Sequence, residues 1–355
     1  MPELAELSIS KNISYFPRTR YQGSKRKLLP WIWDNISFLD FETVLDPFGG
    51  TGSVSYLFKS KNKSVTYNDI LKANYFTGVS LIENGSVLIE DSDLARLLSP
   101  NDEIDNFITD NFRDIYYYDE ENQLLDRIIS NLYKHYGDVK YKKAILLWII
   151  FQACLIKRPF NLFHRKNLNM RSRTVKRSFG NKVTWDGTFE SYINKFKLEV
   201  NNAIFDNTKN CVANNCPVVE LSPFYDLVYI DPPYLSAKGI GVDYHQFYHF
   251  LEGLCNYNDW ESLIDNSKRH KPLLQKPSPW NDKYQIGKAF REVINKFQKS
   301  HLVISYRSDG IPAISELVNE LKQVKRHVKL CEYGTYKYVL SQNGNSQEML
   351  IIAWD

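Results

Sequence analysis

The consecutive residues Asp231, Pro232, Pro233 and Tyr234 carry groups suited to a reaction at the exocyclic amine of a planar base. Such an amine is a poor nucleophile because its lone pair is delocalised into the ring, and it improves when acceptors hold both of its N–H groups. The Asp231 carboxylate is one acceptor, and Pro232 offers a backbone carbonyl without a competing N–H. The ring of Tyr234 offers a face on which a base can stack.

A short strand is expected to hold these residues at the edge of a sheet. The apolar run Leu227–Ile230 suits a buried parallel strand, and the two prolines cannot extend it because neither has a backbone N–H. Asp231 and Tyr234 would therefore lie in the crevice at the carboxyl end of the strand, where open α/β sheets bind ligands. The same four residues would also suit a rigid turn capped by an aspartate. The other motifs of the chain are needed to distinguish a ligand site from such a turn.

A glycine-rich turn follows another predicted strand, Thr43–Asp46, and leads into a helix near Ser53. Glycine lets the backbone approach a ligand closely, and the start of a helix supplies free N–H groups. The turn, residues 46–52, lacks both the Gly-Lys-Ser/Thr of a phosphate-binding loop and the G-x-G-x-x-G spacing of dinucleotide folds. A further strand, Ser64–Asn68, is followed by Asp69, where nucleoside-binding α/β folds place an acid on the ribose hydroxyls. This order of elements predicts a nucleoside site.

Basic and aromatic residues precede this turn, in residues 20–32. Gly23 and Ser24 indicate a turn and an N-cap, with Ser24 opening a helix. A helix N-terminus beside Tyr21 and Lys25 can hold an anionic group such as a carboxylate. A basic, solvated first turn is the alternative.

A second basic segment, residues 157–182, has nine Lys or Arg and no Asp or Glu, interleaved with Phe, His and Asn. Such a segment suits phosphate contacts, and Asn and Arg can also recognise base edges. A solvated loop is the alternative, although the lack of any compensating acid argues against it. The surrounding sequence is typical of helices over residues 88–135, 141–156 and 189–205.

The remaining strands complete an α/β pattern. Apolar runs predict strands near residues 211–214 and 301–306, with a helix near 283–298 before the second of them. Residues 328–338 and 348–354 predict a β-hairpin whose polar turn contains Asn343-Gly344-Asn345.

The composition of the chain argues against several classes of protein. The net charge of +4 over 355 residues is mild, so affinity for nucleic acid has to come from local clustering. Five cysteines without a C-x-x-C pair argue against a disulfide framework or structural zinc. His245 and His249 have no suitably spaced third ligand, so we expect a surface helix there and no metal. The longest apolar run is too short to span a bilayer and no signal pattern opens the chain, so we expect a cytoplasmic protein without a membrane partner.

Three motifs, in this order, resemble the adenine-N6-specific DNA methyltransferases of the Dam-like, D12 class. They are Tyr-Gln-Gly-Ser-Lys-Arg-Lys within residues 20–29, Asp-Pro-Phe-Gly-Gly-Thr-Gly at residues 46–52, and Tyr-Ile-Asp-Pro-Pro-Tyr at residues 229–234. Residues 160–165 and 179–181 also resemble the family's segment that closes its target-recognition insert. Any single motif is weakly specific, whereas the combination is highly specific.

The resemblance implies a fold and a division into domains. The fold would be α/β, with a Rossmann-like S-adenosylmethionine-dependent methyltransferase sheet, a C-terminal β-hairpin and an inserted, mainly helical DNA-recognition domain. Residues 1–84 and 205–355 would form the catalytic methyltransferase domain, and residues 85–204 the target-recognition insert. The resemblance does not extend over residues 85–145.

The resemblance also implies residue roles. Asp231, Pro232, Pro233 and Tyr234 would hold and stack the target adenine. The residues expected to bind S-adenosyl-L-methionine are Tyr21, Lys25, Asp46, Pro47, Phe48, Gly49, Gly50, Gly52, Asp69 and Asn215. Asp69 would bind the ribose, and Asn215 stands where such enzymes often place an acid near the cofactor's adenine ring. The residues expected to bind DNA are Arg158, Asn161, His164, Arg165, Lys166, Arg171 and Arg173.

We therefore expect a site-specific methyltransferase that modifies N6 of an adenine flipped out of double-stranded DNA. It would belong to a bacterial or phage restriction-modification system, with a cognate restriction endonuclease as a candidate partner. The same acceptor geometry would serve cytosine N4 in DNA or adenine in RNA. The non-enzymatic alternative is an inactive nucleic-acid-binding module, which would bind DNA without turnover.

Overall fold

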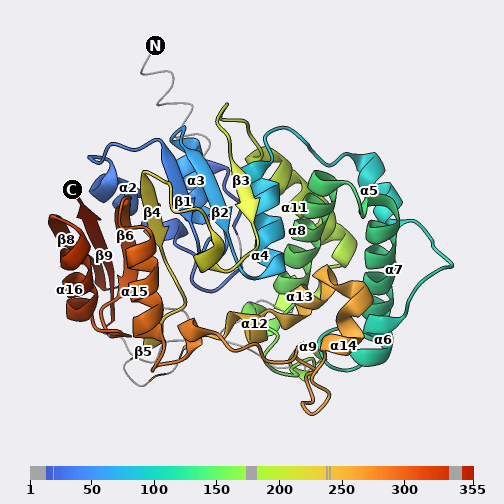
Figure 1. Cartoon of the computed structure of the whole chain (residues 1–355). Coiled ribbons are helices and arrows are strands. Elements are labelled where there is room, and N and C mark those ends of the chain that lie inside the picture. The colour runs from blue at the N-terminus through green and yellow to red at the C-terminus, as the bar shows by residue number, and fades with distance from the viewer. Residues whose placement is uncertain (1–12, 19, 173–181, 237–238, 240, 336–345) are drawn as a thin grey trace.

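A seven-stranded sheet with the order β3-β2-β1-β4-β6-β9-β8 occupies the left part of the molecule as seen in Figure 1. This computed structural model describes residues 13–18, 20–172, 182–236, 239, 241–335 and 346–355. The first five strands of the sheet are parallel, and β9 is antiparallel to both of its neighbours. The strands are β1 (Thr43–Asp46), β2 (Ser64–Asn68), β3 (Val212–Asn214), β4 (Leu227–Ile230), β6 (His301–Arg307), β8 (His327–Thr335) and β9 (Gln347–Trp354). The predicted mixed α/β class with a mostly parallel sheet is confirmed.

Helices make up most of the rest of the described chain. The longer ones are α2 (Leu29–Ile36), α3 (Ser53–Ser60), α4 (Lys72–Gly78), α5 (Asp91–Leu98), α7 (Asp119–Tyr136), α8 (Lys140–Ile156), α11 (Phe189–Ala203), α13 (His249–Cys255), α15 (Ile286–Lys296) and α16 (Ile314–Val324). The shorter ones are η1 (Arg26–Leu28), η2 (Val79–Glu83), α6 (Phe107–Asn111), η3 (Pro159–Asn161), α9 (Asn169–Ser172), α10 (Lys182–Asp186), η4 (Val218–Glu220), α12 (Tyr244–Phe247), η5 (Tyr257–Asp259), α14 (Trp260–Leu263) and η6 (Pro279–Asn281). Two short strands, β5 (Leu235–Ser236) and β7 (Gly310–Ile311), pair separately.

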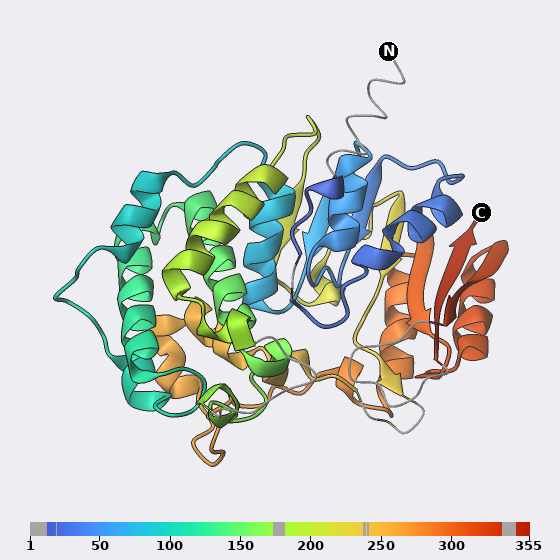
Figure 2. The same ribbon diagram turned by 180° about the vertical axis from the view of Figure 1, so that it is seen from behind.

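Helices cover both faces of the sheet, and β4 shows why its sequence is continuously apolar. Val228 and Ile230 pack in a cluster that includes residues of α15 and α16. Leu227 and Tyr229 point to the other face and pack with residues of α2 and α3. The two helix pairs lie in front of the sheet and behind it in Figures 1 and 2. A strand covered on both sides has no solvent face, so all four residues are buried.

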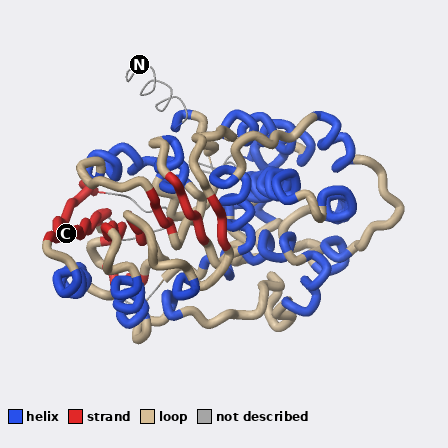
Figure 3. Tube along the Cα trace, turned by 45° about the horizontal axis from the view of Figure 1, so that its top comes forward, coloured by secondary structure: helices blue, strands red, loops and turns tan. Residues whose placement is uncertain are grey.

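A larger group of helices lies beyond the β3 edge of the sheet and is seen at one end of the strand layer in Figure 3. It contains α5 to α11, and α8 contacts α4 next to the sheet. The chain returns to this helical group after β4, because the ring of Phe112 lies 5.2 Å from Phe250 of α13 and 5.1 Å from Trp260 of α14. The helical group is therefore built from two separate stretches of sequence, residues 91–203 and 244–263.

Most of the predicted elements are present, and two local predictions were wrong. The C-terminal hairpin is confirmed as β8 and β9, while its predicted turn lies outside the described residues. Ser24 does not cap a helix; α2 begins at Leu29 after the short turn η1, with proline in its first turn. His249 is fully buried rather than on a surface helix, and its Nε2 lies 2.7 Å from the Tyr116 hydroxyl.

Candidate active site

A cleft of about 2560 Å³ opens where the parallel strands end. Asp46 ends β1, Asp69 follows β2, and Asp231 follows β4, and all three line this cleft. Pro47, Phe48, Gly49, Gly50, Tyr21, Lys25, Asn215, Pro232, Pro233 and Tyr234 line it as well. The structure thus brings together three motifs that are distant in sequence, as expected for the carboxyl edge of an α/β sheet.

Neighbouring side chains hold the Asp231 carboxylate through one of its two oxygens. Its Oδ1 accepts a hydrogen bond from the Tyr234 hydroxyl and lies 3.4 Å from Lys25 Nζ. Within the described part of the chain, each hydrogen bond or ion pair of this carboxylate falls on Oδ1. The side chain is 16% exposed and lines the cleft, so Oδ2 is available to a ligand there.

Lys25 lies behind the acceptor, with its ammonium buried. Nζ donates to the Tyr234 hydroxyl at 2.6 Å and forms an ion pair with Glu348 in addition to the contact with Asp231. Burial alone would lower the pKa of Lys25, but the two carboxylates raise it above its usual value. Three partners engage the three N–H donors of the ammonium. This geometry favours a role for Lys25 in ordering Asp231, and Lys25 also lines the cleft in which the predicted contact with the cofactor would be made.

The three aspartates that line the cleft are largely shielded from water. Burial raises the pKa of Asp231 to about 6, with Lys25 lowering it and Glu348 raising it. Burial also raises the pKa of Asp69 to about 6 and that of Asp46 to about 7. A ligand that donates hydrogen bonds or carries positive charge would lower the free-energy cost of ionising these buried carboxyl groups.

The glycine turn brings main chain to the cleft. Gly50 has φ +52° and Gly52 has φ +74°, a region that glycine adopts without steric cost. Gly52 does not line the cleft and instead precedes the first residue of α3. Asp46 Oδ2 accepts from Ser55 Oγ at 2.7 Å, whereas its buried Oδ1 has no hydrogen bond of normal geometry to the described residues. A buried acceptor without a partner is unusual, and it marks the place where a ligand donor would fit.

Asp69 connects the glycine turn to the end of β2. It accepts from the backbone N–H groups of Gly50 at 2.9 Å and Leu71 at 2.8 Å, and from Asn74 Nδ2 at 3.1 Å. The Asn74 amide also donates to the Tyr21 hydroxyl at 3.0 Å. A carboxylate offers about four acceptor positions, so these three donors leave room for a further one.

Aromatic rings form two walls of the cleft. The rings of Tyr21 and Tyr244 are stacked at 5.5 Å, and Tyr21 also stacks on Tyr248 at 4.2 Å. Phe48 meets Trp280 edge to face at 4.8 Å. These surfaces suit planar rings.

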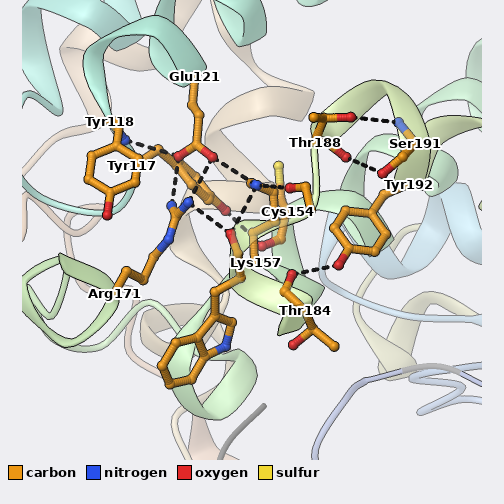
Figure 4. A network of polar contacts seen from close by, with 12 residues as sticks. Tyr117, Tyr118, Glu121, Cys154, Lys157, Arg171, Thr184, Thr188, Ser191 and Tyr192 are labelled. Carbon is orange, nitrogen blue, oxygen red and sulfur yellow. Dashed lines mark hydrogen bonds and ion pairs between the residues drawn. The ribbon is translucent and has the colours of Figure 1, made fainter. Parts of the chain in front are cut away.

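Two of the residues predicted to contact DNA are buried instead. Arg171 makes two hydrogen bonds to Glu121 of α7, of 2.6 and 2.7 Å, and Lys157 pairs with the same carboxylate at 2.8 Å (Figure 4). Arg158 donates to the carbonyl oxygens of Leu162 and Arg165, and its side chain is among the largest fully buried ones. These guanidinium groups hold the helical group together, which does not fit the predicted phosphate contacts.

The other predicted DNA contacts are placed differently. Asn161 lines the main cleft, whereas His164, Arg165 and Lys166 line a second cavity of about 710 Å³. Arg165 and Lys166 are exposed. Arg173 lies outside the described residues, as does the motif at residues 179–181.

Sequence reasoning missed several residues that the structure places at these sites. Glu348 reaches Lys25 from β9, Tyr244 and Trp280 line the cleft, and Arg269 joins the second cavity. Arg269 lies in the basic run Lys268-Arg269-His270-Lys271, which was a usable signal. Tyr244 lies in an aromatic-rich run, Tyr244–Phe250, whereas Glu348 and Trp280 had no such signal in their neighbours.

The described residues also bear on metals and membranes. Among them, no three His, Cys, Asp or Glu side chains come close enough together to hold a metal ion. No helix in the described part of the chain has the length and apolar character needed to cross a bilayer.

Comparison with known proteins adds a family match. Residues 21–300 match the model of the D12 class N6 adenine-specific DNA methyltransferases. The matched region contains Tyr21, the glycine turn and Asp231, and it ends one residue before β6.

Curated relatives agree with this match. The chain is 27% identical over 341 residues to the type II methyltransferase M2.HphI of Haemophilus parahaemolyticus, covering 94% of this chain and 95% of that protein. It is 28% identical to the type II methyltransferase M.FokI of Planomicrobium okeanokoites and to the modification methylase StsI of Streptococcus sanguinis. These two matches cover 85% and 86% of this chain but 46% of each relative, so the chain spans less than half the length of either.

Proposed function

The chain belongs to the family of D12 class N6 adenine-specific DNA methyltransferases, and on this premise we propose how it acts. It transfers a methyl group from S-adenosylmethionine to N6 of an adenine flipped out of duplex DNA. The observation that carries this proposal is the Asp231 carboxylate, ordered through Oδ1 and open to the cleft through Oδ2, in the same cleft as the glycine turn and Asp46.

The cleft fits the proposed cofactor. Asp46 Oδ1 has no hydrogen bond of normal geometry to the described residues, and the amino group of the methionine part can supply a donor. Asp69 has room for a ribose hydroxyl, and Phe48 with Trp280 offers an apolar surface for the adenine ring. Asn215 lines the cleft while its Nδ2 donates to the Asp69 carbonyl at 2.7 Å, which leaves its oxygen as an acceptor for an amine. When bound, the cofactor supplies an electrophilic methyl group on a sulfonium.

The remaining residues hold the target base. Asp231 Oδ2 and the Pro232 carbonyl accept the two N–H groups of the amine, which favours a tetrahedral nitrogen whose lone pair is directed at the methyl group. Pro233 fixes the backbone that presents them. The hydroxyl of Tyr234 is engaged with Asp231 and Lys25, and Tyr234 lines the cleft in which its ring would stack on the base.

DNA would lie across the cleft and the helical group. A base inside a duplex cannot reach Asp231, so the adenine has to leave the stack. Arg165 and Lys166 are exposed next to Arg269 around the second cavity and can contact backbone phosphates. We propose that the catalytic domain comprises residues 1–84 and 205–355, of which residues 244–263 pack against the insert 85–204. We propose that this insert recognises the target sequence through residues that include Asn161 and His164.

The biological setting follows from the relatives. M2.HphI and M.FokI are named as type II methyltransferases. A modification enzyme of this kind protects host DNA from a nuclease with the same recognition sequence. We therefore propose that the chain acts in a restriction-modification system with a cognate endonuclease.

The direct test is to incubate the purified protein with labelled S-adenosylmethionine and either duplex DNA or RNA, then digest each nucleic acid to nucleosides. The expected product is N6-methyladenine at one sequence motif, located by sequencing with detection of modified bases. N4-methylcytosine, label appearing in RNA alone, or DNA binding without any transfer would each contradict the proposal.

A further inference from the structure

Glu348 is a buried carboxylate close to the acceptor that none of the roles above uses. It lies on β9 and is 0% exposed. Its Oε1 accepts from Ser305 Oγ at 2.7 Å, pairs with Lys25, and lies 3.3 Å from the Tyr234 hydroxyl. An ionised carboxylate this far from water is costly unless it is paired, so its position needs an explanation.

Lys25 connects this carboxylate to the acceptor. The single ammonium contacts Glu348 and Asp231 at once, so two acids share one cation. If Glu348 were neutral, the ammonium would pair with Asp231 alone and would compete with an incoming amine for the same carboxylate. Sharing the cation weakens its hold on Asp231 and still keeps Asp231 ordered.

We propose that Glu348 is a positioning residue for methyl transfer, because it holds the Lys25 ammonium between two carboxylates and so leaves Asp231 Oδ2 free to accept the amine of the target base. Glu348 touches neither reacting atom and acts through Lys25. This inference rests on the proposed function, since it takes Asp231 as the acceptor.

The charges around Asp231 fix the expected sign of a pH effect. The groups that face it are Lys25, Glu348, Tyr234, Asp46, Tyr229 and Tyr244. Glu348 raises the pKa of Asp231 by like-charge repulsion, and Lys25 lowers it. Removing the charge of Glu348 should therefore lower the pKa of Asp231, and removing that of Lys25 should raise it.

The first experiment compares Glu348→Gln and Lys25→Met with the wild-type protein in single-turnover methyl transfer across pH. We expect Glu348→Gln to slow transfer by about tenfold or more and to move the acidic limb of the rate profile to lower pH. Lys25→Met should move the same limb to higher pH. A limb that stays at its wild-type position in Glu348→Gln, whatever the rate, would overturn the inference, because a purely structural defect would not shift it.

The second experiment remains decisive if Glu348→Gln fails to fold. Removing both members of a buried ion pair is tolerated better than removing one, so Lys25→Met/Glu348→Gln should fold at least as well as either single variant. Because Glu348 acts through Lys25, the double variant should transfer methyl groups within about twofold of Lys25→Met alone. A further large loss of rate in the double variant would show that Glu348 acts independently of Lys25.

Two controls keep the outcomes separate. Glu332→Gln changes an exposed glutamate of β8 in the same hairpin, and it should leave both the rate and the acidic limb unchanged. The wild-type protein tests the function itself: if it forms no N6-methyladenine, the proposed function fails together with this inference. If it is active and the limb of Glu348→Gln does not move, the inference about Glu348 alone fails.

Discussion

Arg171 and Glu121 form a two-pronged ion pair inside the helical group, with hydrogen bonds of 2.6 and 2.7 Å. Arg171 is 2% exposed, and Nη2 also donates to the Trp185 carbonyl at 3.0 Å. The pair connects α9 to α7, while the Trp185 carbonyl extends the connection to α10. Its role is therefore to hold three helices together.

Breaking this pair should destabilise the protein without changing how it contacts phosphates. We expect Arg171→Met to lower the free energy of unfolding by on the order of 3 kcal/mol, because Glu121 loses a buried partner. Urea denaturation followed by circular dichroism measures this loss. The matched control is Arg165→Met on the exposed surface, which should leave stability within about 0.5 kcal/mol of the wild type. Equal stability of the two variants would contradict the structural role of Arg171.

Neutralising the exposed cations Arg165 and Lys166 should weaken the contacts with phosphates without destabilising the protein. We expect Arg165→Gln/Lys166→Gln to weaken DNA binding and to reduce the slope of log K against log salt by about 2, since each phosphate contact contributes about 0.9. Fluorescence anisotropy at several salt concentrations measures the slope. An unchanged slope would move the DNA surface away from the second cavity.

Replacing the acceptor should separate binding from transfer. Asp231→Ala removes the carboxylate that holds the amine, so we expect the rate of transfer to fall by about 100-fold or more. Calorimetric titration should find S-adenosylmethionine binding largely intact, because Asp46 and Asp69 are unchanged. Retained activity would refute the role of Asp231.

Asp46 should make the stability of the cofactor-free protein depend on pH. Burial raises its pKa from 3.8 to about 7, so the folded state favours the protonated acid. The resulting stabilisation is fully present below the unfolded value of 3.8 and is lost as pH rises through the folded value of about 7. We expect the thermal unfolding temperature of the wild type to fall over this range.

The matched variant for this prediction is Asp46→Asn, which stays neutral at every pH. It should be more stable than the wild type above the folded pKa, by on the order of a few kcal/mol, and its unfolding temperature should depend less on pH. Scanning calorimetry on both proteins measures the difference. Parallel pH profiles for the two proteins would contradict the assignment.

The local sequence pattern was sufficient to predict the residues that line the cleft at the carboxyl ends of strands. Asp46, Asp69 and Asp231 each end or immediately follow a short strand, and parallel strands bring such residues to one edge. Glu348 could not be found in this way, because it contacts Lys25 across 323 residues of sequence. Nothing in its neighbours distinguishes it from a surface glutamate at the start of a strand.

The error over Arg158 and Arg171 has a similar cause. Their segment contains no acid, so the sequence suggested that its charges face a polyanion. The partner of Arg171 instead comes from α7, 50 residues earlier, and Arg158 is satisfied by backbone carbonyls. A dense run of basic residues therefore indicates that their side chains need anionic or polar partners. It does not show whether those partners are phosphates or oxygen atoms of the protein.

The return of the chain to the helical group after β4 has a consequence for the proposed recognition insert, residues 85–204. Phe250 and Trp260 fill the interior between helices that come from the other stretch of sequence. A chimera that transplants residues 85–204 alone from a relative would place foreign side chains against these two rings. On the proposal that residues 85–204 recognise the target sequence, we expect that residues 244–263 of this chain have to be exchanged together with that stretch for specificity to be transferred.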